Sequence, residues 1–193
     1  MQSSAKKESI RRVIDQLLAA PDFESRLPEL LEIPARKAVN PLFAHLCDPD
    51  ERVKMRAVKA LGVIVGNLAE HDAESARVIM RRFMWNLNDE SGCIGWGAPE
   101  ALGEIMAVSE KLAREYAHVL VSYVREDGNF LEYEPLQQGV LSGLVRLAEA
   151  RPGLLKSAAL HIEPFLRSKN PVLRGLAARI LGLIGAKAMG PEK

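Results

Sequence analysis

The chain has 193 residues, of which 48% are hydrophobic, 26% are charged and 5% are aromatic. That length fits one or two ordinary domains, and the hydrophobic share is sufficient for a core. The formal net charge of +1 excludes a global field that would attract nucleic acid or an anionic membrane. No segment reaches the roughly 18 consecutive apolar residues of a membrane-spanning helix. Two cysteines are too few for a disulfide framework, so we expect a reduced, cytoplasmic protein.

Prolines divide the N-terminal part of the chain into short predicted helices. Three such helices are expected, over residues 5–20, 22–32 and 35–46. The first carries an apolar stripe at helical spacing, formed by Ile10, Val13, Ile14, Leu17 and Leu18. Pro49 follows in a turn and can serve as the first residue of the next helix.

From there the chain repeats itself with a period of about 40 residues. The segments VKMRAVKALGVI (Val53–Ile64) and IGWGAPEALGEI (Ile94–Ile105) share the pattern Ala-x-x-Ala-Leu-Gly-x-Ile. A weaker copy covers 136–147, and a fourth over 173–184 restores Leu-Gly-x-Ile. Another apolar-striped helix precedes each later copy, at about 73–88, 109–125 and 153–168. Helix pairs that repeat with this period predict an α-solenoid.

The first copy also carries the residues of a known repeat. The pattern Asp48-x4-Val53-Lys54-x2-Ala57-x2-Ala60-Leu61-Gly62 resembles the HEAT repeat, in particular the short HEAT-like repeats of phycobilin lyases and of many bacterial and archaeal proteins. The resemblance covers about residues 35–187, and it implies two-helix repeats whose second helices line a concave face. The second copy departs from the family, because Gly95 stands where a basic residue belongs. The fourth copy departs too, with Ser168 in place of the aspartate.

We therefore expect an all-α fold, an α-solenoid with the twist of a right-handed superhelix. It would consist of about four HEAT-like helix pairs over residues 35–187, N-terminal capping helices over 1–34, and a disordered C-terminal tail over 188–193. Small residues recur at helical spacing, and we expect them to let neighbouring helices approach closely. These scaffold positions are Ala57, Ala60, Gly62, Ala101, Gly103, Ala177 and Gly182.

The segment from Asn86 to Glu104 is the candidate working surface. Three glycines and Trp96 lie within the six residues 92–97. Each glycine costs roughly 0.5–1 kcal/mol of helix stability, which a chain that needed only to fold would avoid. The next turn should lie beside it and brings Phe130 and Tyr133 next to carboxylates. The residues predicted to bind a ligand or partner are Arg81, Trp85, Asp89, Glu90, Trp96, Glu100, Phe130, Glu132 and Tyr133.

Each of these predictions has a purely structural alternative. Acidic residues recur in turns because they cap exposed backbone N–H groups, which applies to Asp48, Asp50 and Asp127 as well. Arg81 near a helix C-terminus would interact favourably with the helix dipole, or it could pair with a carboxylate of the neighbouring turn. An aromatic side chain such as Phe130 could simply belong to the core.

Catalytic and metal-binding patterns are weak. The four histidines are scattered and fit no zinc-ligand spacing. Cys93 lies in the glycine-rich turn, but no histidine is close to it in the sequence. We therefore expect no catalytic residue, no metal and no cofactor.

Three classes of function remain open. The leading hypothesis is a non-enzymatic scaffold or adaptor that binds a protein or peptide, possibly a basic one, through the turn around Trp96. A second is a lyase or chaperone that handles a tetrapyrrole or similar cofactor, which the resemblance to phycobilin lyases implies. The third is nucleic-acid binding by a basic concave face formed by Lys54, Lys59, Arg146, Arg174 and Arg179, which the acidic turns and the near-neutral charge make improbable.

Overall fold

The computed structural model describes residues 2–88 and 95–188, and all regular secondary structure in these ranges is helical. The α-helices are α1 (Gln2–Ala19), α2 (Phe23–Arg26), α3 (Ala35–Ala44), α4 (Glu51–His71), α5 (Ala73–Asn88), α6 (Ala98–Val108), α7 (Glu110–Ser122), α8 (Glu134–Ala150), α9 (Ala159–Ile162) and α10 (Pro171–Ala188). Short 3-10 helices cover Leu27–Glu32, His45–Cys47, Pro152–Ala158 and Glu163–Arg167.

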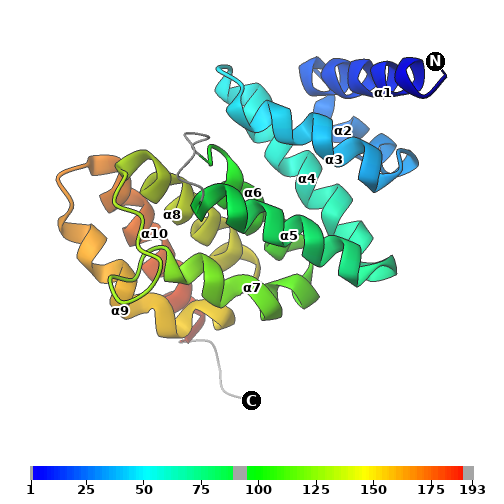
Figure 1. Ribbon diagram of the computed structural model, residues 1–193. Helices are drawn as coiled ribbons and strands as arrows, with labels where there is room; N and C mark the ends of the chain where they lie inside the picture. Colours follow the sequence, from blue (N-terminus) through cyan, green and yellow to red (C-terminus); the bar gives the residue numbers. More distant parts are fainter. Residues whose placement is uncertain (1, 89–94, 189–193) are drawn as a thin grey trace.

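The helices form two layers of an α-solenoid, which confirms the predicted fold class. The second helices of the repeats, α4, α6, α8 and α10, pack against one another in one row. The first helices α3, α5 and α7 form the second layer, which packs against this row (Figure 1). Hydrogen bonds and an ion pair tie neighbouring first helices together: Arg36 to Ser75, Arg82 to Asn40, and Arg77 to Glu115.

Helix α1 and the segment after it cover the first repeat. Ile14, Leu17 and Leu18 are buried against α3 and α4, but Val13 is 45% exposed, so the predicted apolar stripe was too wide. The contact with α3 and α4 covers the centre of the stripe and leaves its edge in solvent. At the end of α1, the Arg56 side chain of α4 donates to the Leu18 carbonyl at 2.7 Å, which satisfies an exposed helix-end acceptor.

The predicted helix over 153–168 is wrong in detail. This segment consists of a 3-10 helix, the single turn α9 and a second 3-10 helix. Pro164 has no N–H to donate, so it cannot make the hydrogen bond that would continue α9 as an α-helix. The apolar spacing still buries Leu155, Ile162 and Phe165 against α10 and its neighbours, so the segment keeps the place of a first repeat helix.

Glycines set the spacing within the row of second helices. A Cβ at Gly103 of α6 would overlap the backbone of Gly143 in α8, and a Cβ at Gly143 would overlap the carbonyl of Pro99. A Cβ at Gly62 of α4 would instead lie 2.6 Å from Cγ of Glu104. Gly182 differs, because no heavy atom of the described chain lies within 4 Å of its Cβ position. Close helix approach therefore explains Gly103 but not Gly182.

We expect Gly103→Ala and Gly182→Ala to change the stability in opposite directions. Gly103→Ala forces α6 and α8 apart, which should destabilise the protein by about 1–3 kcal/mol despite the better helix propensity of alanine. Gly182→Ala meets open space and should stabilise by about 0.4–1 kcal/mol. Urea denaturation followed by circular dichroism measures both values. A stability gain in both variants would contradict the close contact between α6 and α8.

Candidate functional site

Trp96 and Tyr133 meet at one corner of the solenoid. Their ring centroids are 6.0 Å apart with an interplanar angle of 71°, an edge-to-face arrangement. Trp96 is half-buried and Tyr133 is 50% exposed, so the pair presents aromatic surface to solvent. The turn before α6 depends on Gly97, which has a φ of 70° and no room for a side chain beside Leu46.

The carboxylates predicted around this aromatic pair separate into three groups. Asp89 and Glu90 lie outside the described residues. Glu132 is exposed beside Tyr133. Glu100 turns to the concave face, one helical turn after Trp96, and its Oε2 atom is buried with no hydrogen-bond partner among the described residues.

Phe130 does not join the pair. It lines a separate cavity with Phe165 of the fourth repeat, and neither Trp96 nor Tyr133 lines that cavity. The turn after α7 therefore places its two aromatic side chains, Phe130 and Tyr133, in two different places.

Arg81 and Trp85 lie on α5, in the layer of first helices. The Arg81 guanidinium donates to Glu74 of the same helix at 2.7 Å, and this contact raises its pKa. The alternative in which Arg81 pairs with a carboxylate of the neighbouring turn is not what the described residues show. Trp85 is 72% exposed.

A groove on the concave face crosses the second helices of three repeats. Its volume is about 530 Å³. It is lined by Glu24 and Leu27 before the first repeat and, along α4, α6 and α8, by Met55, Val58, Lys59, Val63, Glu100, Glu104, Ser142, Arg146 and Glu149. The sequence prediction named Glu100 from this set as a binding residue and did not identify the groove.

Glu100 is the unusual group in the groove. A Cβ at Gly139 of α8 would lie 2.9 Å from its Oε2 atom, so the absence of a side chain at Gly139 makes room for the carboxyl. Burial raises the pKa of Glu100, and the positive charge of Lys54 opposes this shift in part.

The five basic residues predicted to form a nucleic-acid-binding face each have a partner among the described residues. Lys54 pairs with Glu51 at 2.6 Å, Lys59 with Glu24 at 2.5 Å, and Arg146 with Glu104 at 2.6 Å. Arg179 pairs with Glu149, and Arg174 donates to the carbonyls of Ser168 and Lys169. No observation among the described residues therefore favours a basic concave face for nucleic acid.

Comparison with known proteins identifies the repeat. The family model described as "HEAT repeat" matches residues 38–68, which contain most of α3 and α4. The chain therefore contains a HEAT repeat at residues 38–68, set within an α-solenoid. The phycobilin-lyase type of repeat finds no support among these matches, and no curated protein matches the chain.

Solved structures of engineered proteins share the fold of this HEAT-like protein. One crystal structure is 20% identical with a TM-score of 0.50, and the match covers 91% of this chain and 79% of that one. Another is 16% identical with a TM-score of 0.53, and the match covers 95% of this chain and 93% of that one. At these identities the likeness concerns the fold alone.

The acidic turns of the repeats have structural roles. Asp50 caps α4 by accepting from the Arg52 N–H at 2.9 Å, and Asp48 accepts from the Asp50 N–H at the same distance. Asp127 is paired with Arg125 at 2.7 Å. The capping alternative thus accounts for Asp48 and Asp50, and an ion pair accounts for Asp127.

Within the described ranges, no group of three or more His, Cys, Asp or Glu side chains is arranged to hold a metal ion. His45 lies between Asp15 at 2.8 Å and Asp48 at 3.2 Å, where it ties α1 to the first repeat. Within residues 2–88 and 95–188, no helix combines the length and apolar character needed to cross a bilayer.

Glu100→Gln should change the pH dependence of stability. The ordinary pKa of a glutamate is about 4.3, and the folded pKa of Glu100 is raised by burial. Between these two pKa values the folded state binds more protons than the unfolded state. The free energy of unfolding therefore falls as the pH rises through this window, and the loss persists at all higher pH. We expect the melting temperature of Glu100→Gln to exceed that of the wild type at neutral pH, with the difference narrowing as the pH falls through that window toward about pH 4.

Thermal denaturation at several pH values measures this difference. Glu132→Gln, which removes an exposed carboxylate on the same edge, serves as the matched control and should follow the wild type. A melting temperature of Glu100→Gln that stays below the wild type by the same amount at every pH would contradict the buried, ionised carboxyl.

Proposed function

We propose that this HEAT-like protein is a non-enzymatic scaffold that binds a protein or peptide segment in its concave groove, and that the bound segment is basic. A HEAT-like repeat scaffold fits a role in protein interaction, because stacked repeats present extended concave surfaces. The observation that carries the proposal is the groove that crosses α4, α6 and α8.

The lining of the groove supports a partner with both apolar and basic side chains. Apolar surface comes from α4, where Met55 is 38% exposed, and from Leu27, Val58 and Val63 beside it. The charged residues that line the groove are four glutamates and two cations: Glu24, Glu100, Glu104, Glu149, Lys59 and Arg146. Lys59, Arg146 and Arg179 pair with three of these glutamates, which leaves the Glu100 carboxyl without a charged partner. This carboxyl favours a segment that carries lysine or arginine.

The aromatic corner is the second surface in this proposal. Trp96, Tyr133 and Glu132 stand at the same end of α6 and α8 as Glu100, so a bound segment that leaves the groove there would meet them. Partly exposed aromatic side chains are common anchors in protein interfaces. We retain Asp89 and Glu90 as proposed members of this corner, and Phe130, Arg81 and Trp85 as residues apart from it.

Among the described residues, no specific observation favours the two other functions. A tetrapyrrole-handling lyase would need a pocket built around Trp96 and Tyr133, and neither residue lines the concave groove or the cavity at Phe130. Nucleic-acid binding needs unpaired cations to displace counterions, and the cations of the second helices are already paired. A cytoplasmic location stays a prediction from the sequence.

Selection from a random displayed-peptide library against the immobilised full chain tests the proposal. We expect the selected peptides to be enriched in lysine and arginine. Met55→Lys places a cation in the groove, and it should weaken the binding of a selected peptide at least about tenfold, or about 1.4 kcal/mol. Fluorescence polarisation of the labelled peptide measures the dissociation constant.

The control is Val78→Lys, the same change at a 54%-exposed residue of the first helix α5. It should leave the affinity unchanged. If Tyr133→Ala weakens binding and Met55→Lys does not, the binding surface is the aromatic corner rather than the groove. Peptides without basic residues, bound equally well by Met55→Lys, would remove the groove from consideration.

A further inference from the structure

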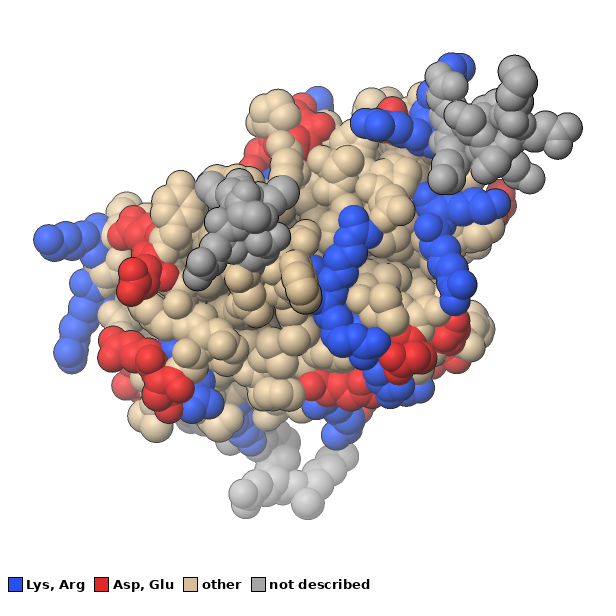
Figure 2. Space-filling view, in the orientation of Figure 1, with Lys and Arg blue, Asp and Glu red and all other residues tan. Residues whose placement is uncertain are grey.

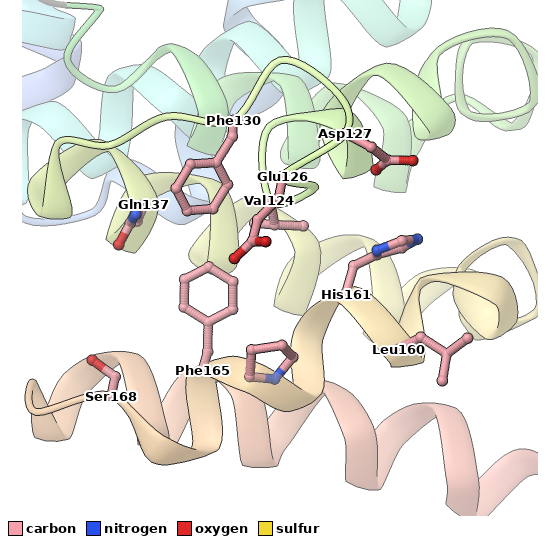
Figure 3. Close-up of a pocket in the computed structure, with 10 residues that line it drawn as sticks. Val124, Glu126, Asp127, Phe130, Gln137, Leu160, His161, Phe165 and Ser168 are labelled. Carbon is pink, nitrogen blue, oxygen red and sulfur yellow. The ribbon is translucent and has the colours of Figure 1, made fainter.

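A second cavity, of about 540 Å³, lies between the turn after α7 and the first segment of the fourth repeat. Figure 3 shows the rings of Phe130 and Phe165 entering it from opposite sides, with the Glu126 carboxylate between them in this view. Val124 and Phe165 are buried at its base, and Leu160 is 74% exposed at its rim. It shares no lining residue with the concave groove.

The turn that carries Phe130 is held in place from several sides. The N–H groups of Asn129 and Leu131 donate to carbonyls at the end of α7, at 3.0 and 3.2 Å. The Gln137 side chain of α8 donates to the Leu131 carbonyl at 2.8 Å. Gly128 lets the turn pass close to Ser122, since a Cβ there would lie 2.8 Å from the Ser122 carbonyl oxygen. The cavity is therefore bordered by a fixed wall.

The polar groups of this cavity are mostly acceptors. Glu126 has no partner among the described residues, and Asp127 is paired with Arg125, which itself does not line the cavity. The side-chain amide nitrogen of Gln137 donates to the Leu131 carbonyl in the turn, and the side-chain oxygen can accept a hydrogen bond from a ligand. His161 and Ser168 complete the polar lining, and neither lysine nor arginine belongs to it.

Acceptors between aromatic rings suit one class of ligand. A cation on an apolar stem gains from the faces of phenyl rings and from a carboxylate, while its stem packs on apolar side chains. An anion would meet Glu126 and Asp127, and a purely apolar ligand would leave the Glu126 carboxylate desolvated without a partner.

We propose that this cavity binds an organic cation, an alkylammonium or guanidinium group on an aliphatic stem. Phe130 and Phe165 contact the stem and the cation, and Glu126 accepts a hydrogen bond from it. Such a group can come from a lysine or arginine side chain of a peptide or from a free aliphatic amine. The proposal is independent of the function assigned to the concave groove.

Titration followed by NMR shifts of the backbone amides in the full chain tests this site. The probes are n-pentylamine, N-acetyl-lysine amide and N-acetyl-arginine amide, with n-pentanol and pentanoate as neutral and anionic analogues. We expect saturable shifts of residues around the cavity with at least one cation, and dissociation constants at least fivefold weaker for both analogues. Binding of the blocked amino acids assigns the site to a peptide side chain, and binding of pentylamine alone assigns it to a free amine.

Glu126→Gln and Phe130→Leu should each weaken the binding of the best probe at least fivefold. Glu163→Gln, an exposed carboxylate of the same fourth-repeat segment that does not line the cavity, should leave it unchanged. The melting temperature of each variant reports whether the fold is kept. Pentanol that binds as tightly as pentylamine, an unchanged affinity in Glu126→Gln, or no saturation by any cation up to about 10 mM would overturn the proposal.

Discussion

The direct approach of α6 and α8 at Gly103 and Gly143 is the constraint on which the rest of the solenoid depends. A HEAT-like repeat cannot bury its apolar face alone, so its core exists only where neighbouring repeats touch. Two glycines allow the backbones of these helices to meet directly, which brings Ile105 and Leu144 into the closed core behind them. The concave groove takes its shape from this spacing, since its walls are the second helices themselves.

The cations along the concave groove form ion pairs with neighbouring glutamates. Lys59, Arg146 and Arg179 are each matched by a glutamate. Figure 2 shows acidic and basic side chains interspersed in the same way on the face that it presents, with broad uncharged areas between them. Among the carboxylates that line the two cavities, Glu100 and Glu126 are the ones with no partner among the described residues, one in each cavity.

The repeat period predicted the helix pairs, and α5 begins and ends where the pattern placed it. The sites were harder, because they depend on which way a side chain turns. Phe130 and Tyr133 are three residues apart and lie in different places, since the turn between them is not helical. The groove could have been predicted from one repeat position, the residue two before the leucine that recurs in each copy. In the first three copies this residue lines the groove, as Lys59, Glu100 and Ser142. In the fourth copy it is Arg179, which forms an ion pair with the lining residue Glu149.

Within the row of second helices, the α6–α8 contact and the α4–α6 contact differ in how readily they can be deformed. Between α6 and α8, backbone meets backbone at Gly103, and such a contact yields only if a whole helix moves. Between α4 and α6, Gly62 meets the side chain of Glu104, which can yield by torsion about its own bonds. The α6–α8 contact is therefore the rigid part of the row, whereas the α4–α6 contact rests on a side chain that can adjust its conformation.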